Sequence, residues 1–226
     1  MPSNTTVVIG ASRGIGLELA KFLAQNPDNR VIATMRKPFN LDQPNIDVLE
    51  LDQTSQRSVD IAAKKVAEAD ILIVNGAIGE DELLTQISSD RLLHYLDTNV
   101  VGPHRVINAF LPALRVRTTR KIIYISSTAA SLTGQVGENW GLRGPYATSK
   151  AAGNMLTIQF HNELHEEGFT FVAIHPGWVA TDMGNIAGPG AMPVTEAVQK
   201  IMKIVNGLEK ADGATFFNID GTILPW

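Results

Sequence analysis

Short apolar runs alternate along the chain with stretches in which apolar residues recur every three or four positions. Val7, Val8 and Ile9 form a continuous apolar run that ends at Gly10, which predicts a buried strand over residues 5–10. The same pattern predicts further strands over residues 30–35, 47–51, 71–74, 121–126, 169–175 and 214–219. Helical spacing predicts helices over residues 14–25, 55–69, 90–114, 145–167 and 194–207.

Strands and helices therefore alternate throughout, and the strands are rich in Val and Ile with little polar alternation. Such runs are typical of a parallel sheet that helices cover on both faces, and right-handed crossovers then give a doubly wound α/β fold. No repeat or linker divides the chain, so residues 1–226 are predicted to form one domain. Gly102-Pro103 predicts a disturbance in the third helix, and Gly168 a C-terminal cap after the fourth.

Two stretches, residues 128–144 and 183–193, are loop-like for their length. Both follow the C-terminal ends of strands, where open α/β sheets bind ligands. The second stretch is rich in Gly, Ala and Pro, which is the composition of a mobile lid. Apolar residues in or beside these loops either line a substrate pocket or only pack locally, and they are Trp140, Leu142, Trp178, Met183 and Ile186.

Composition narrows the function classes. The 226 residues carry a net charge of −4 with no basic run, which argues against a nucleic-acid partner. The absence of cysteine excludes disulfides, thiolate metal sites and cysteine nucleophiles. No apolar run approaches the roughly 20 residues of a membrane span, and the first residues lack a signal-peptide pattern. We therefore expect a cytoplasmic protein with no membrane partner.

A glycine-rich turn joins the first predicted strand to the first helix. Glycine permits a tight turn and close approach to a phosphate, and the helix N-terminus adds free N–H groups and a positive dipole end. The spacing Gly-x-x-x-Gly-x-Gly is not the better-known Gly-x-Gly-x-x-Gly, and no P-loop lysine follows. An ordinary tight turn is the alternative, but three glycines favour a dinucleotide pyrophosphate. The predicted contacts are Gly10, Ser12, Arg13, Gly14, Ile15 and Gly16.

The end of the second strand bears on the choice of coenzyme. An acidic residue there would bind the ribose hydroxyls of NAD, but the chain has Arg36 instead. Arg36 and Arg13 suit a 2′-phosphate, because a guanidinium has a fixed charge and forked donors; solvated surface arginines are the alternative. The pattern favours NADP(H) over NAD(H). Asp52 and its neighbour Gln53 are further predicted coenzyme contacts, with Asp52 accepting from the adenine amino group or else capping the next helix.

The candidate chemistry lies in Tyr146 and Lys150. A tyrosine with its ordinary pKa near 10 is a poor base at neutral pH, but a nearby cation lowers that pKa. Lys150 follows four positions later, which puts both side chains on one helix face. The pair can then act as general acid in reduction and as general base in oxidation. The alternative is a packed tyrosine ring beside a solvated lysine.

Other polar residues support the catalytic interpretation. Ser126 and Ser127 end a buried strand, where a hydroxyl can hold a substrate carbonyl. Asn99 lies inside an apolar helix, which is unfavourable unless its amide has a specific partner. After the sixth strand, Pro176 and Gly177 would turn the chain close to a nicotinamide. His175 is expected to be a buried, hydrogen-bonded residue rather than a catalyst.

These residues together resemble the classical short-chain dehydrogenase/reductase family over essentially the whole chain. The motifs that carry the resemblance are Gly10 to Gly16, Asp52, Asn75-Gly76-Ala77, Asn99, Ser127, Tyr146-x-x-x-Lys150 and Pro176-Gly177-x-x-x-Thr181. The resemblance implies a seven-stranded Rossmann-like sheet of order 3-2-1-4-5-6-7. It also implies a tetrad in which Asn99 holds a relay water, Ser127 orients the carbonyl, Tyr146 transfers the proton and Lys150 binds the ribose and lowers the tyrosine pKa. Further implied coenzyme contacts are Asn75, Gly76, Ala77, Tyr146, Lys150, Pro176, Gly177, Val179 and Thr181.

The chain departs from the family pattern in two places. The family's Asn-Asn-Ala-Gly is replaced by Asn75-Gly76-Ala77-Ile78. Ser127 and Tyr146 are nineteen positions apart, a longer gap than usual, which leaves Ser126 and Ser131 as alternative carbonyl holders. The longer loop and the short ending after the seventh strand are similar to the branch with fungal ketoreductases and C-factor-like proteins.

The predicted function is NADPH-dependent reduction of a ketone or aldehyde to an alcohol, or the reverse, on a small-molecule substrate. The alternative is a catalytically silent NADP-binding regulator or scaffold of the same fold. The resemblance also implies a homodimer or homotetramer built on helices 90–114 and 145–167. His161 and His165 have a spacing that metal sites use, but no third ligand suggests itself, so no metal is predicted.

Overall fold

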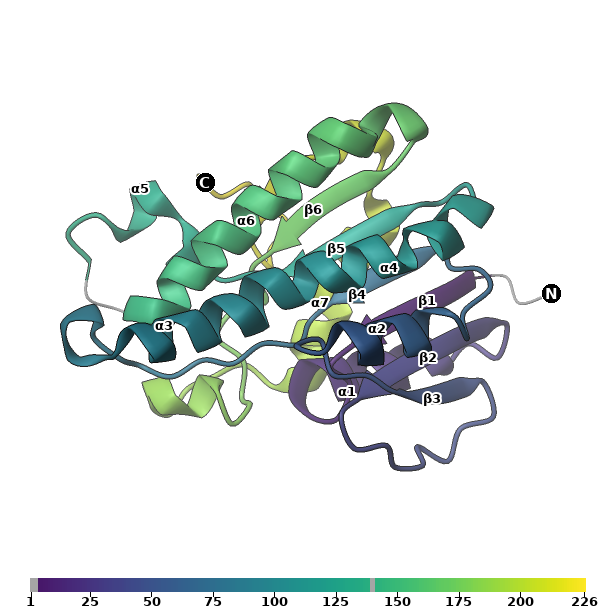
Figure 1. The fold of residues 1–226 in the computed structure, drawn as a ribbon, viewed down its shortest axis with the longest axis horizontal. Coiled ribbons are helices and arrows are strands. Elements are labelled where there is room, and N and C mark those ends of the chain that lie inside the picture. The colour runs from purple at the N-terminus through teal and green to yellow at the C-terminus, as the bar shows by residue number, and fades with distance from the viewer. Residues whose placement is uncertain (1–3, 139–140) are drawn as a thin grey trace.

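The computed structural model describes residues 4–138 and 141–226 (Figure 1). All seven strands join one parallel sheet in the order β3-β2-β1-β4-β5-β6-β7, which confirms the predicted fold class. The strands are β1 (Asn4–Ile9), β2 (Asn29–Met35), β3 (Ile46–Glu50), β4 (Ile71–Val74), β5 (Lys121–Ile125), β6 (Thr170–Ile174) and β7 (Thr215–Phe217).

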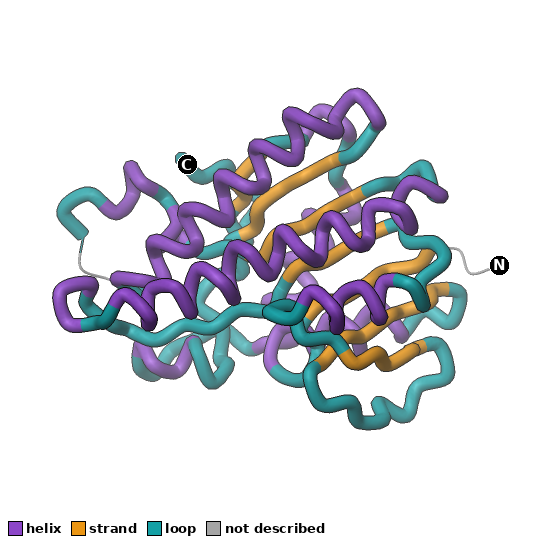
Figure 2. The backbone as a smooth tube through the Cα atoms, viewed as in Figure 1, coloured by secondary structure: helices purple, strands orange, loops and turns teal. Residues whose placement is uncertain are grey.

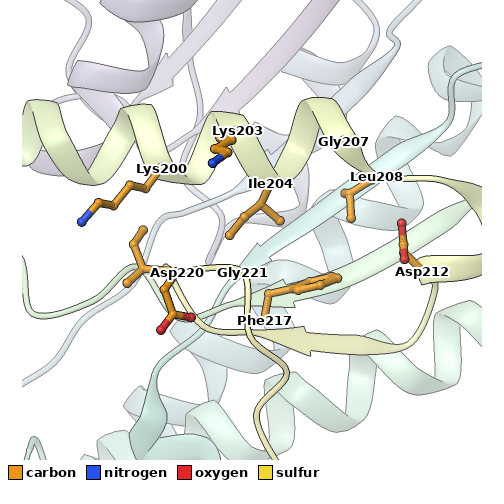
Figure 3. Close-up of a pocket in the computed structure, with 10 residues that line it drawn as sticks. Lys200, Lys203, Ile204, Gly207, Leu208, Asp212, Phe217, Asp220 and Gly221 are labelled. Atoms are coloured by element: carbon orange, nitrogen blue, oxygen red, sulfur yellow. The ribbon is translucent and has the colours of Figure 1, made fainter.

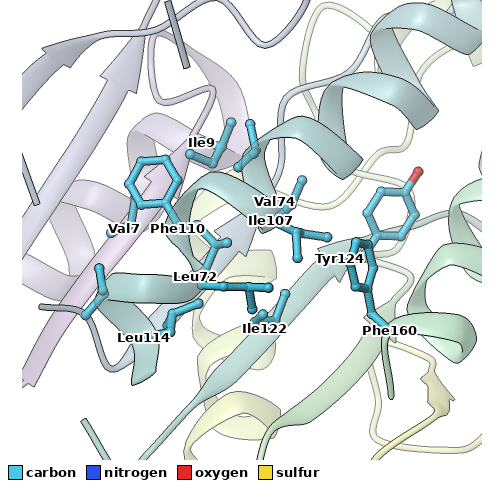
Figure 4. Close-up of a cluster of buried hydrophobic side chains, with 14 of the residues drawn as sticks. Val7, Ile9, Leu72, Val74, Ile107, Phe110, Leu114, Ile122, Tyr124 and Phe160 are labelled. Atoms are coloured by element: carbon cyan, nitrogen blue, oxygen red, sulfur yellow. The ribbon is translucent and has the colours of Figure 1, made fainter. Parts of the chain in front are cut away.

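Helices cover the sheet on both faces. The helices α2 (Gln56–Ala63), α4 (Gly102–Val116) and α6 (Gly144–Leu164) lie in front of the sheet in Figure 2, and α1 (Gly14–Ala24) and α7 (Val194–Gly207) lie behind it. Alternate residues of one strand face opposite layers, since Val7 and Ile9 belong to the front cluster and Val8 to the rear one (Figure 4). Both faces are buried, which is why the strands show no polar alternation.

The second predicted helix is shorter than expected. Residues 55–69 were expected to be helical, but α2 ends at Ala63. The next N–H groups bond three residues back, from Lys65 to Ala62 and from Val66 to Ala63. Such tighter turns keep Val66 buried on the same side, so hydrophobic spacing alone does not distinguish them from a continuing α-helix.

The predicted helix over residues 90–114 has the expected disturbance, which is a π-helical turn. The segment consists of α3 (Ser89–Leu96), this π-helical turn (Asp97–Val101) and α4. In a π-helix the N–H of residue 103 would donate to the Thr98 carbonyl, and in an α-helix to the Asn99 carbonyl. Pro103 has no N–H and can donate to neither. Side chains of other elements bond to both carbonyls: Gln53 Nε2 donates to Thr98 at 2.7 Å, and Tyr124 Oη donates to Asn99 at 3.3 Å.

The two predicted loops contain short helical elements that their composition did not indicate. The first holds a 3-10 turn (Thr128–Ala130) and α5 (Leu132–Gln135), and the second holds a 3-10 turn (Gly184–Ala187). Helix α6 continues as a 3-10 turn (His165–Glu167), and Gly168 at φ +83° ends it as predicted.

Residues 221–226 fold back along the outer edge of β7. The Leu224 N–H donates to the Phe216 carbonyl at 2.7 Å, and the ring of Trp226 stacks on that of Phe216. The Trp226 carbonyl accepts from the Ser131 hydroxyl at 3.4 Å. This tail therefore covers the sheet edge and joins it to the loop that follows β5.

Candidate active site

The glycine turn forms the coenzyme end of the site. A Cβ on Gly10 would lie 2.7 Å from the Gly76 Cα, and one on Gly16 would overlap the Gly10 carbonyl, so side chains are excluded at both positions. Asn75 Nδ2 donates to the Gly10 carbonyl at 3.0 Å and ties the turn to the end of β4. The Arg13 side chain does not cap α1, so the first N–H groups of the helix are not paired by a capping side chain there. This bare, glycine-lined helix start fits a pyrophosphate.

The residues predicted for the adenine end are Arg36, Asp52 and Arg13. Arg36 is exposed beyond β2. Asp52 Oδ1 accepts from the Thr54 N–H at 2.9 Å and from its hydroxyl at 2.7 Å, so Asp52 also makes the turn before α2. Burial would raise the pKa of Asp52, but the Thr54 hydrogen bonds and the charge of Arg36 hold that pKa below its ordinary value. Arg13 forms an exposed ion pair with Asp182.

The Gln53 side chain has a structural use that the sequence did not indicate. It is 8% exposed, and its Nε2 donates to the Gly76 carbonyl at 3.0 Å as well as to Thr98. A Cβ on Gly76 would lie 2.7 Å from Gln53 Oε1. Gly76 stands where the family has asparagine, so an amide from the end of β3 fills the space beside this glycine.

The four predicted catalytic residues come from three elements. Tyr146 and Lys150 lie on one face of α6, Ser127 follows β5, and Asn99 lies in the π-helical turn. Lys150 Nζ donates to the Ile125 carbonyl at 2.7 Å and lies 5.8 Å from the centre of the Tyr146 ring. The Ser127 hydroxyl contacts the Tyr146 phenol and accepts from the Ala129 N–H at 3.2 Å, which leaves its own proton free to donate.

The alternative serines are engaged elsewhere. The Ser126 hydroxyl donates to Asn154 Oδ1 at 2.6 Å and is 2% exposed. The Ser131 hydroxyl accepts from the Gly134 N–H at 3.0 Å and donates to the tail carbonyl. Ser127 is thus the serine whose hydroxyl faces Tyr146.

Burial sets the proton affinities of the pair in a way that spacing did not indicate. Burial raises the pKa of Tyr146 to about 12, and the Ser127 hydrogen bond only partly opposes this. Burial also lowers the pKa of Lys150 to about 7. The expected lowering of the tyrosine pKa by Lys150 is not seen, because desolvation is the largest influence on both groups. The arrangement therefore holds Tyr146 as a protonated donor.

Asn99 holds the loop after β4 against α6. Its Nδ2 donates to the Ile78 carbonyl and to the Ser149 hydroxyl, and its Oδ1 accepts from the Ile78 N–H, each at 2.9 Å. These bonds give the buried amide the specific partners that its place in an apolar helix required. In the same loop, a Cβ on Gly79 would lie 2.8 Å from the Tyr146 ring, so the loop backbone packs directly on the catalytic tyrosine.

Sequence reasoning missed the ion pair that fixes the start of α6. Asp81 binds Arg143 through two hydrogen bonds of 2.9 and 2.8 Å and also accepts from the Arg143 N–H at 3.3 Å. Its carboxylate therefore anchors Arg143, the residue at which α6 begins and whose own side chain makes no capping hydrogen bond. No local signal indicates a partner 62 positions away.

A cavity of about 430 Å³ opens beside the tetrad. Ser127 and Tyr146 line it together with Leu142, Trp178, Met183 and His175, and the coenzyme-binding candidates Ile15, Pro176, Gly177, Val179 and Thr181 line it too. Its walls are mostly apolar. Ile186 is half exposed, and Trp140 lies outside the described residues. A second hollow, of about 540 Å³, lies between α7 and β7 and is lined by Lys200, Lys203, Asp212 and Asp220 but by none of the tetrad (Figure 3).

His175 was expected to be buried and hydrogen-bonded; it is hydrogen-bonded but only partly buried, in the wall of the cavity. Its Nδ1 accepts from the Thr128 N–H at 3.2 Å, and burial lowers its pKa to about 4. Between pH 4 and its ordinary 6.5 the unfolded chain holds one more proton, so stability is lost as pH falls through this window. We expect wild type to lose about 2 kcal/mol between pH 6.5 and pH 4 that His175→Asn does not lose, measured by denaturant unfolding. His94→Gln, at an exposed histidine, is the control; an unchanged acid profile in His175→Asn would contradict the assignment.

Among the described residues, no group of three or more His, Asp or Glu is placed to hold a metal ion; His161 and His165 lie 5.1 Å apart, ring centre to ring centre, without a third such partner. Within residues 4–138 and 141–226, none of the helices has the length and apolar character to cross a bilayer.

The chain is similar in sequence to known oxidoreductases. The family model for short chain dehydrogenases matches residues 4–190. An uncharacterised oxidoreductase of Schizosaccharomyces pombe is 34% identical over 97% of this chain and 96% of its own length. The C-signal of Myxococcus xanthus is 35% identical over 70% of this chain and 92% of its own length.

Two solved structures of carbonyl reductases have a similar fold over nearly the whole chain. The NADPH-bound carbonyl reductase from chicken fatty liver is 30% identical, with a TM-score of 0.91 over 99% of this chain and 94% of that one. The carbonyl reductase Sniffer of Drosophila melanogaster is 28% identical, with a TM-score of 0.88 over 99% of each chain. The chain therefore belongs to the short-chain dehydrogenase/reductase family and is an NAD(P)-dependent oxidoreductase, related to fungal oxidoreductases and to the bacterial C-signal.

Proposed function

We propose that this protein reduces a ketone or aldehyde with NADPH, using Tyr146 as the proton donor. One observation carries the proposal: the Ser127 hydroxyl and the Tyr146 phenol meet at the wall of an apolar cavity. Other walls of that cavity belong to the segments that would hold the coenzyme. A carbonyl oxygen placed between the two hydroxyls would receive hydrogen bonds from both.

Each residue then has a defined part in reduction. A nicotinamide coenzyme held by the glycine turn and by Pro176, Gly177 and Thr181 would supply the hydride. Ser127 donates a hydrogen bond to the carbonyl oxygen and holds it in place, and Tyr146 gives its proton to that oxygen as negative charge develops there. Lys150 provides positive charge near the resulting phenolate. Leu142, Trp178 and Met183 line the cavity and keep water from the reacting carbon.

The preference for NADPH rests on Arg13 and Arg36. Both are exposed and carry fixed positive charge, and the only described partner of Arg13 is Asp182, at the surface. A 2′-phosphate would offer these guanidinium groups more charge than a carboxylate does. The chicken carbonyl reductase, which is similar over nearly the whole chain, is NADPH-bound, in agreement with this proposal.

We expect Arg36→Ala and Arg13→Ala each to weaken NADPH binding about tenfold and to change NADH binding by less than about threefold. The reason is that only NADPH carries the 2′-phosphate. Coenzyme titration followed by protein fluorescence measures this without any turnover. Lys37→Ala, one position beyond Arg36, is the matched control. Equal losses for the two coenzymes would contradict the assignment.

The apolar cavity favours a small or medium carbonyl compound with few charges. NADPH consumption against a panel of aldehydes, aliphatic ketones and aromatic ketones tests the proposal. Turnover on some of these compounds supports it. Tight NADPH binding with no turnover on any of them would instead favour a regulator or scaffold. Two further features stay predictions: assembly as a homodimer or homotetramer, and a cytoplasmic location.

A further inference from the structure

The side chain of Lys150 lies between two tyrosine rings. Its Nζ is 5.8 Å from the centre of the Tyr146 ring and only 4.8 Å from that of Tyr124, a residue of β5 with no place in the tetrad. Lys150 is 3% exposed and Tyr124 is 4% exposed. In the described part of the chain, no carboxylate forms an ion pair with Lys150. The Tyr124 ring and the Ile125 carbonyl are thus the nearest groups that favour its charged form.

The hydroxyl of Tyr124 reaches a second member of the tetrad. It donates to the Asn99 carbonyl at 3.3 Å, one of the two carbonyls that Pro103 cannot serve. The phenol points out of the apolar cluster toward α6 (Figure 4), where a Cβ on Gly153 would overlap it. One buried side chain therefore contacts Lys150 through its ring and Asn99 through its hydroxyl.

We propose that Tyr124 is a positioning residue for the reduction: its ring holds Lys150 as an ammonium beside Tyr146, and its hydroxyl fixes the Asn99 carbonyl of the π-helical turn. Tyr124 does not line the cavity, so it acts through these two residues and not on the substrate. The inference rests on the proposed function for its kinetic consequence. Its structural part, the hold on Lys150, can be measured without catalysis.

Few other titratable groups face Lys150. Tyr146 faces it from α6 and Tyr124 from β5, and burial raises the pKa of both phenols, so both are neutral near pH 7. Asp97, in the π-helical turn, forms an ion pair at the surface instead. His175, after β6, is neutral above about pH 4. A change in Lys150 titration after substitution of Tyr124 therefore reports the loss of the ring.

The direct test is an NMR titration of Lys150 in protein labelled with ¹³C at the lysine Cε, with Lys150→Arg to assign the signal. We expect Tyr124→Leu to lower the pKa of Lys150 by about one unit, because the cation–π contact is lost, and Tyr124→Phe to leave it unchanged. Tyr124→Met keeps more volume and serves if the leucine variant does not fold. Phe110→Leu, an equally buried substitution in the same cluster, controls for loosened packing and should not move the titration. A wild-type pKa in the leucine or methionine variant would overturn the inference.

Kinetics separate the two parts of the side chain. Loss of the ring should move the alkaline limb of kcat/KM about one unit toward acid, since the ammonium is then lost at lower pH. Tyr124→Phe should keep that limb but lower kcat about threefold to tenfold at constant KM, because the Asn99 carbonyl loses its donor. A phenylalanine variant with wild-type kcat would overturn the role of the hydroxyl. If wild type reduces no carbonyl, the proposed function fails, and the titration still decides whether Tyr124 holds Lys150.

Discussion

Replacing Tyr146 with phenylalanine should reduce turnover about a thousandfold while NADPH still binds. The variant loses one oxygen, and with it the phenol proton at the cavity wall, so that Ser127 is left to hold the carbonyl. The ring is 6% exposed and packs with Tyr95 and Ala129, so phenylalanine keeps the packing. The measurement is NADPH oxidation with the best substrate of the panel, beside a fluorescence titration with NADPH.

The control for this substitution lies on the same helix. Thr148 is exposed two positions away, and Thr148→Ala should keep wild-type turnover. Circular dichroism and the unfolding midpoint should agree for all three proteins. Residual activity above one tenth of wild type in Tyr146→Phe would show that another group donates the proton, and the proposed mechanism would then be wrong.

Lys150→Met should have two opposite effects: turnover falls by at least about a hundredfold, and the folded state becomes more stable by about 2 kcal/mol at pH 7. The lysine is almost completely buried, and no carboxylate of the described residues pairs with it, so folding must desolvate its charge or remove its proton. Methionine has a similar length and carries no charge. The loss of turnover follows because no positive charge then stands near the Tyr146 phenolate.

The pH dependence of stability isolates the lysine. Its folded pKa of about 7 lies below the ordinary value of 10.5, so between these values the unfolded chain holds one more proton than the folded chain. The contribution of Lys150 to stability therefore rises with pH across this window. Denaturant unfolding at pH 7, 8 and 9 should show this rise in wild type and not in Lys150→Met. Lys200→Met, at an exposed lysine paired with Glu196, is the control. A less stable Lys150→Met protein would contradict the analysis.

Much of the fold could be predicted from the sequence, because its signals are local. Runs such as that ending at Gly10 identify strands, and their alternation with helices determines a doubly wound sheet. The glycine turn and the pair Tyr146 and Lys150 each carry enough local pattern to be identified, whereas the sequence left Ser126 and Ser131 as alternatives to Ser127. Their joint resemblance to one family then predicted that they form one site.

The remaining features depend on contacts between distant segments. The spacing of Tyr146 and Lys150 indicated a shared helix face, but the direction of both pKa shifts depends on burial by other elements. Gln53 was expected at the coenzyme, yet its side-chain amide bonds to Gly76 and Thr98, because a glycine and a proline elsewhere leave space and free carbonyls there. Hydrogen bonds of this kind join segments far apart in the chain, and they leave no periodic pattern in a single sequence.

The tail over β7 bears on how molecules of this protein meet one another. An uncovered outer strand offers free N–H and C=O groups to any extended segment of a neighbour and so promotes aggregation. Here Leu224 takes up that hydrogen bonding, and Trp226 shields the ring of Phe216. Resistance to aggregation at high protein concentration thus depends on residues 221–226, which take no part in the chemistry.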